Sequence, residues 1–192
     1  AATASASVLL NEFQPNPSGA DPANQNFELL GTPGASFNGW ILSIESDSTS
    51  GMGTVDRATN VSGTFDMMTG LLVVSVPDLE NPTFTIVLLD GAGGFTGTAG
   101  TTDIDTDNDG VADDLSTFGT VLDALGSPDN VSDAGNLYGA QLGGTDMSAI
   151  GTIEPNLVFR DSGSLDWYAV TYEPAVYDAS ATAVDAGLFD ID

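Results

Sequence analysis

Aspartate occupies every second position in one short stretch of the chain, Asp103-Ile104-Asp105-Thr106-Asp107-Asn108-Asp109-Gly110. Carboxylates packed this closely repel one another unless a cation lies among them. The alternation lets Asp105, Asp107 and Asp109 turn inward on a tightly wound loop, and Gly110 stands where such a loop turns sharply. This is how the calcium loop of an EF-hand begins. The sequence therefore predicts a calcium (Ca2+) loop over residues 103–116, whereas the plainer interpretation is a solvated acidic loop.

The other ligands of this predicted site follow the glycine. Val111 would offer its backbone carbonyl, and Asp113 would bind directly or through a water. The twelfth position, where an EF-hand loop carries a bidentate glutamate, is Ser116. Another acid must then complete the shell, and the nearby candidates are Asp114, Asp123, Asp129 and Asp133. The predicted metal ligands are Asp103, Asp105, Asp107, Asp109, Val111, Asp113 and Asp114.

A second cation site is a weaker expectation. Three glutamates lie on consecutive predicted strands, and two aspartates lie in adjoining loops: Glu12, Glu28, Glu45, Asp21 and Asp47. If the strand register aligned them, their oxygens would converge and require a counterion. The alternative is that they alternate outward on a solvated face.

Short runs of β-type residues separated by turn residues fill most of the chain. The predicted strands are residues 7–13, 26–30, 37–45, 71–76, 83–89, 157–160 and 166–172. Of these, residues 71–76 and 83–89 are nearly continuous apolar runs and are predicted to be core strands. Residues 48–63 are polar and rich in Gly, Thr and Ser, which indicates a long loop or irregular edge. No segment carries a helical period beyond a turn or two. The sequence predicts an all-β sandwich with long loops.

Three of these runs also resemble a known family. The order Asn11-Glu12-Phe13, then Asn26-Phe27-Glu28-Leu29, then Gly39-Trp40-Ile41-Leu42 resembles the lamin-tail domain. The resemblance implies an immunoglobulin-like β-sandwich, secreted in bacteria alone or beside extracellular nucleases and phosphatases. Residues 84–89, the Asp-rich loop and residues 119–125 resemble a secreted subfamily with an inserted calcium loop. The expected organisation is an N-terminal extension (1–6), a lamin-tail-like sandwich (7–175) and a C-terminal tail or edge strand (176–192).

Charge and composition exclude several classes of function. The chain has 28 acidic residues and two basic ones, Arg57 and Arg160, for a net charge of −26. Such a surface repels nucleic acid and anionic membranes, and no apolar run approaches the roughly 18 residues of a membrane span. The absence of His, Cys and Lys removes the Ser-His, Cys-His and Schiff-base systems. We therefore expect no enzyme, no nucleic-acid binding and no membrane insertion.

The remaining features point outside the cell. The Ala/Ser/Thr-rich residues 1–6 resemble the region around a signal cleavage site, and could instead dock on a neighbouring copy. Arg57 and Arg160 are expected to pair with carboxylates, while Trp40 and Trp167 are expected to pack in the core or offer a sugar-binding platform. The expected protein is secreted, calcium-stabilised and structural or adhesive. It would associate with itself or with other cell-surface components. The alternative is an accessory domain of an extracellular nuclease or phosphatase.

Overall fold

The fold is an all-β sandwich, as the sequence predicts. The computed structural model describes residues 8–20, 22–47, 51–79, 83–171 and 175–189. Sheet A has seven strands in the order β12 (Ala183–Val184), β11 (Val176–Asp178), β10 (Trp167–Val170), β9 (Leu157–Arg160), β1 (Leu9–Phe13), β2 (Asn24–Leu30) and β5 (Leu71–Pro77). Sheet B has five, in the order β4 (Val55–Thr64), β3 (Ser36–Glu45), β6 (Phe84–Asp90), β7 (Val121–Ser127) and β8 (Thr145–Asp146). The described residues contain no α-helix, only the short 3-10 helix η1 (Ala186–Leu188).

An inner core fills the space between the two sheets. Sheet A contributes Phe13, Phe27 and Leu29, and sheet B contributes Ile86 and Leu88, all at most 2% exposed. In β2 these buried residues alternate with partly or fully exposed ones, which is the pattern of a strand with one covered face. The rings of Phe13 and Phe27 stack at 4.5 Å between centroids and tie β1 to β2 across the core face.

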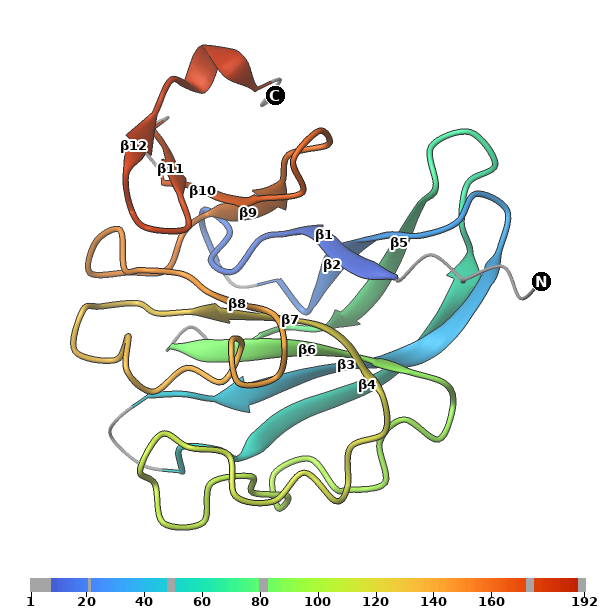
Figure 1. The fold of residues 1–192 in the computed structure, drawn as a ribbon, viewed down its shortest axis with the longest axis vertical. Coiled ribbons are helices and arrows are strands. Elements are labelled where there is room, and N and C mark those ends of the chain that lie inside the picture. Colours follow the sequence, from blue (N-terminus) through green and yellow to red (C-terminus); the bar gives the residue numbers. More distant parts are fainter. Residues whose placement is uncertain (1–7, 21, 48–50, 80–82, 172–174, 190–192) are drawn as a thin grey trace.

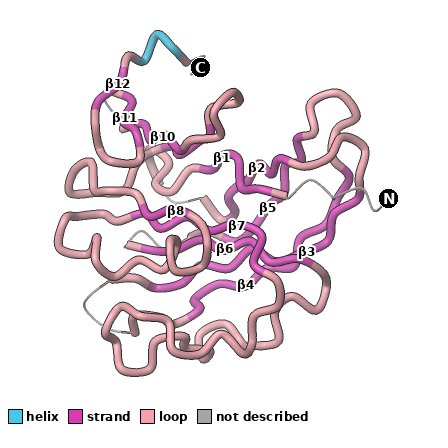
Figure 2. Tube along the Cα trace, in the orientation of Figure 1, coloured by secondary structure: helices cyan, strands magenta, loops and turns pink. Residues whose placement is uncertain are grey.

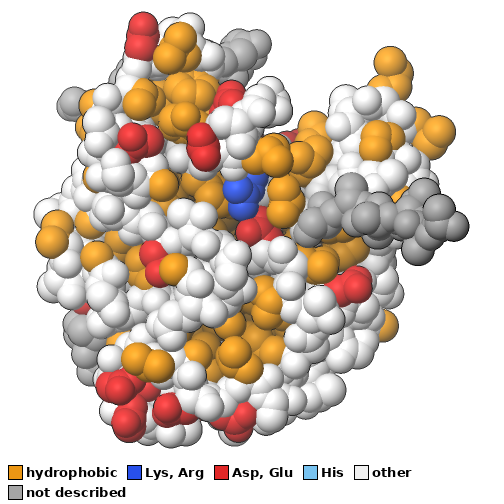
Figure 3. Space-filling view, in the orientation of Figure 1, with side chains coloured by type: hydrophobic (Ala, Val, Ile, Leu, Met, Phe, Trp, Pro, Cys, Tyr) orange, Lys and Arg blue, Asp and Glu red, His pale blue; other side chains and the backbone are white. Residues whose placement is uncertain are grey.

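A second, outer core covers the far face of sheet B. Val87 and Leu89 of β6 point away from sheet A and pack with Ile104 and Tyr138, which come from loops. This explains why β6 is buried at every residue except its last: a strand covered on both faces reads as a continuous apolar run. Figures 1 and 2 show the long loops that form this third layer beneath sheet B. Acidic side chains gather along the lower edge of the same layer (Figure 3).

Two expectations about strands were wrong. Residues 48–63 were expected to be a long loop or irregular edge, but residues 55–64 form the ten-residue strand β4. β4 lies at the edge of sheet B, where antiparallel pairing with β3 supplies the backbone hydrogen bonds and most of its side chains need no apolar partner. β5, expected in the core, is the edge of sheet A: Val74 and Val76 are buried, but Val73 is 60% exposed.

The two ends of the chain can be compared with the expected domain organisation. Residues 1–6, expected to form an N-terminal extension, lie outside the described residues. Residues 176–192, expected to be a C-terminal tail or edge strand, contain β11 and β12, which continue sheet A beyond β10, with β12 at its edge. Phe189 packs against Tyr168 and Phe159 on that sheet, with ring centroids 4.7 and 5.3 Å apart.

Candidate metal centre

The Asp-rich loop is fastened to the β3–β4 connection by its second residue. Ile104 is fully buried in the outer core, its N–H donates to the Gly53 carbonyl at 2.9 Å, and its own carbonyl accepts from Asp113 N–H at 2.6 Å. Gly53 has a φ of +86°, and a Cβ there would lie 2.6 Å from the Asp105 Cβ. Only glycine lets the two chain segments approach this closely. The apolar residue inside the acidic run therefore sets where the loop sits.

Asp105 is the buried centre of the loop. Its Oδ1 accepts from Asp109 N–H at 3.1 Å, and its Oδ2 accepts from Gly110 N–H at 2.8 Å and from the Tyr138 hydroxyl at 2.7 Å. Burial alone would raise the pKa of this carboxyl, but the hydrogen bonds from Tyr138, Gly110, Asp109 and Asn108 outweigh it and lower the pKa. Asp105 is thus a fixed, ionised carboxylate in the wall of the loop.

Asp105, Asp107 and Asp109 come together, as predicted. Each offers a carboxylate oxygen, and these three atoms lie within 4.8 Å of one another. The pKa of Asp107 is raised, chiefly by the charge of Asp109, then by burial and by Asp113 and Asp105. Gly110 follows with a φ of +84°, the left-handed conformation of the expected sharp turn. The cluster could hold a metal ion, which would relieve the repulsion that these charges exert on one another.

The other predicted ligands carry hydrogen bonds within the loop. Asp103 Oδ1 accepts from Asp105 N–H at 2.9 Å, and Asp113 Oδ2 accepts from the N–H and hydroxyl of Thr106 at 3.1 Å each. Asp114 Oδ1 accepts from the N–H of Ser116 at 2.8 Å, and Ser116 occupies the position where an EF-hand has its glutamate. Val111 N–H donates to Asp109 Oδ1 at 2.9 Å. These residues shape the loop, and their role as ligands stays a prediction.

The candidates for a twelfth ligand lie elsewhere. Asp123, on β7, accepts two hydrogen bonds from Arg160 Nη2, at 3.0 and 2.8 Å, so this candidate is paired with an arginine instead. Asp129 accepts from the Thr83 hydroxyl at 2.8 Å, and the side chain of Asn130 bridges Asp129 and Asp133. None of these three acids belongs to the cluster found among the described residues.

The expected second site does not form as one group. Glu12 and Glu28 are partners across β1 and β2 in sheet A. Glu45 is in sheet B, where it pairs with Phe84, and its Oε1 accepts from Asp47 N–H at 2.7 Å. Asp21 lies outside the described residues. The expectation was wrong for the set as a whole because the second and third strands belong to different sheets.

Two residues at the metal centre have no signal in the sequence motif. Tyr138 holds Asp105, and Gln141 clamps the loop from the same segment: its Nε2 donates to the Gly110 carbonyl at 2.7 Å, and its Oε1 accepts from Ala112 N–H at 3.0 Å. Both come from a turn-rich stretch about 30 residues downstream of the loop. Only the apolar pair Leu137-Tyr138 among glycines and polar residues marked this segment as one that packs.

Another buried acid makes the stability of the fold depend on pH. Glu154 is 2% exposed, and burial, reinforced by the nearby charge of Asp129, raises its pKa to about 7. The folded state therefore holds a proton that the unfolded state loses at lower pH, so Glu154 reduces stability as the pH rises from about 4.5 to 7. We expect Glu154→Gln to stabilise the protein at pH 8 by about 2 to 3 kcal/mol and to change little at pH 4, as measured by urea unfolding. A gain of equal size at both pH values would contradict this assignment.

No helix in the described part of the chain is long and apolar enough to cross a membrane. Comparison with protein-family models, curated proteins and solved structures finds no match to this chain.

Proposed function

We propose that this is a calcium-stabilised, lamin-tail-like β-sandwich protein with a structural or adhesive role outside the cell. The observation that carries the proposal is the Asp105–Asp107–Asp109 cluster, which lies in a loop that covers sheet B. A bound ion would draw these carboxylates together and fasten the loop layer onto the outer core. The adhesive role involves other copies of the chain or other surface components.

Calcium suits this cluster better than other common metals. All three ligands are carboxylates, and the chain contains no His or Cys, which zinc and copper sites usually require. Calcium accepts irregular shells of six to eight oxygens, whereas magnesium demands a near-ideal octahedron. Backbone carbonyls and waters can complete such a shell where the twelfth-position glutamate is absent. Extracellular calcium would fill even a weak site of this kind.

The surroundings of the loop favour a clamp over a switch. A calcium sensor moves two helices that flank its loop. Here the loop is followed by β7, and its Ile104 is anchored in the outer core. Calcium binding would then add to the stability of one arrangement, because a ligand that binds only the folded state stabilises it.

Variants of the cluster test the proposal. We expect Asp107→Asn and Asp109→Asn each to weaken calcium binding by about 100-fold, because each removes one anionic ligand from the shell. The matched control is Asp90→Asn. Asp90 is an exposed carboxylate at the end of β6 and pairs with Gly39 at one end of β3, whereas the loop lies near Glu45 at the other end of β3. The control should bind calcium like the parent protein in isothermal titration calorimetry. Equal losses in all three variants would show that only overall charge attracts the ion.

A second variant tests the support of the buried ligand. Tyr138→Phe removes the hydroxyl that donates to Asp105 Oδ2 but keeps the ring in the outer core. Because partners of metal ligands typically contribute 10- to 100-fold in affinity, we expect calcium affinity to fall by about tenfold. The same titration measures it, and an unchanged affinity would mean that Tyr138 only packs.

A further inference from the structure

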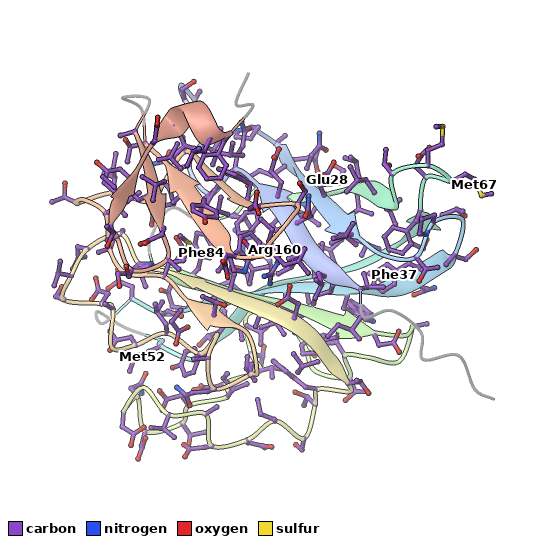
Figure 4. All side chains as sticks on the ribbon, turned by 45° about the horizontal axis from the view of Figure 1, so that its top comes forward. Glu28, Phe37, Met52, Met67, Phe84 and Arg160 are labelled. Carbon is purple, nitrogen blue, oxygen red and sulfur yellow. The ribbon has the colours of Figure 1, made fainter. Side chains whose placement is uncertain are left out.

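The surface of sheet A carries a cavity that the calcium proposal does not use. Its volume is about 500 Å³, and its lining includes Glu12, Glu28, Asn26 and Val73. Glu12 and Glu28 each precede or follow a core phenylalanine along their strands, so their side chains project from the face of sheet A that points away from sheet B. Figure 4 labels Glu28 on β2, apart from the loop layer.

Two carboxylates face each other in this cavity. Glu12 and Glu28 are direct partners across the antiparallel strands, an arrangement in which like charges destabilise the sheet. Burial and the charge of Glu28 together raise the pKa of Glu12. Glu28 Oε1 accepts from Asn11 Nδ2 at 2.7 Å, but that amide is neutral. Among the described residues that line the cavity there is no arginine, so this lining supplies no cation to the pair.

Gln25 also borders the cavity, but its side chain lies on the opposite face of β2, because Gln25 is two residues from the core residue Phe27. Gln25 is 5% exposed, and its Nε2 donates to Asp78 Oδ1 at 2.7 Å. Its Oε1 has no hydrogen-bond partner in the described structure.

The remaining lining is partly apolar and partly polar. Val73 is 60% exposed, and Phe13, Pro17 and Pro22 also border the cavity. This combination favours a ligand with a cationic, N–H-bearing head and an alkyl stem, because such a stem packs on apolar surface while its head reaches the carboxylates. A bare metal ion would leave the apolar wall unused.

We propose that this cavity binds a lysine or arginine side chain of a partner protein. The chain itself has no lysine and two arginines. Arg160 is committed to Asp123, and Arg57 already has interactions within its own chain, including a hydrogen bond from its Nη1 to the Asp56 carbonyl at 3.3 Å. The partner is therefore a different and more basic protein. This inference rests on the proposed adhesive role and states which side chains of a partner the protein would bind. It does not depend on calcium.

The test uses three blocked peptides: acetyl-Gly-Lys-Gly-amide, its arginine counterpart and its norleucine counterpart. Norleucine keeps the alkyl stem and lacks the charge. We expect the two basic peptides to produce saturable nuclear magnetic resonance shifts in the amides of β1, β2 and the segment between them, and the norleucine peptide to produce none. Glu12→Gln/Glu28→Gln should lower the affinity at least about tenfold, because it removes the charge-assisted hydrogen bonds.

Charge-matched controls make the outcome decisive. Asp90→Asn/Asp166→Asn removes two exposed carboxylates outside the cavity and should change the affinity less than twofold. An equal loss in both double variants, or shifts spread over the whole surface, would overturn the proposal. So would calcium alone shifting the amides around Glu12 and Glu28, since the cavity would then be a metal site.

Two further measurements separate folding and calcium from binding. Glu12→Gln/Glu28→Gln should melt no lower than the parent protein, because it removes a repulsive pair. The Asp107→Asn protein should bind the basic peptides as the parent does. A peptide affinity that fell with calcium affinity would contradict an independent site, whereas loss of calcium binding alone would leave this proposal standing.

Discussion

Replacing Arg160 with methionine is expected to destabilise the fold by about 3 to 5 kcal/mol, the usual cost of leaving a buried charge without its partner. The Arg160 side chain is 10% exposed and that of Asp123 is 5% exposed. The Nε of Arg160 donates to the Leu10 carbonyl at 2.9 Å, and its Nη1 donates to the Leu165 carbonyl at 2.6 Å. The guanidinium also lies 4.3 Å from the centre of the Trp167 ring. Figure 4 labels Arg160 between the two sheets.

The size of the effect follows from what the ion pair joins. Arg160 is on β9 and Asp123 is on β7, so the pair links sheet A to sheet B. Asp123 Oδ2 also accepts from Leu10 N–H on β1, at 3.0 Å. Burial raises the pKa of Asp123 even with Arg160 beside it, so the carboxylate alone would be poorly tolerated between the sheets.

Urea unfolding of single and double variants measures this contribution. Arg160→Met leaves Asp123 charged and buried, whereas Arg160→Met/Asp123→Leu removes both charges and should recover most of the lost stability, since apolar replacements of a buried pair are often neutral. A loss below about 1 kcal/mol for Arg160→Met would place the pair among exposed ion pairs and contradict the account.

Removing calcium is expected to have the second large effect. If calcium is present at about 1,000 times its dissociation constant, its loss should lower the free energy of unfolding by about 4 kcal/mol. The melting temperature in excess chelator should fall accordingly. The control is the Asp107→Asn protein: with an affinity about 100-fold weaker, its stability should respond to the same calcium or chelator by about 1.4 kcal/mol, roughly a third of the parent's response. An unchanged melting curve for the parent protein would contradict the proposed clamp.

The fold follows from local pattern where one face or both faces of a strand are covered. β2 was predicted as a strand, and in the structure Phe27 and Leu29 alternate inward along it; the continuous apolar run of β6 predicted a core strand. The polar β4 carried no such pattern, because an edge strand is held mainly by backbone pairing with β3. Whether two successive strands share a sheet depends on long-range pairing, and this is why the three glutamates expected at a second site are divided between the sheets.

The metal centre was predictable to the extent that it is local. Asp105, Asp107 and Asp109 converge within a few residues of Gly110, so spacing alone placed them. Tyr138 reaches Asp105 from 33 residues away, through packing in the outer core that no short motif records. The role of Asp123, one of the candidates for the twelfth ligand, was not predictable for the same reason: its partner Arg160 is 37 residues distant in sequence and lies on the other sheet.

Hydrogen exchange with and without calcium tests the central claim most directly, because it locates the effect of the ion. The amides of Asp109 and Gly110 donate to Asp105, and that of Ala112 donates to Gln141. We predict that chelation speeds exchange at these amides and across residues 103–114 and 137–142 by at least about tenfold, while β1 and β2 change little until the protein unfolds. Equal exchange with and without calcium, or an equal change in every strand, would contradict calcium as the clamp of the loop layer.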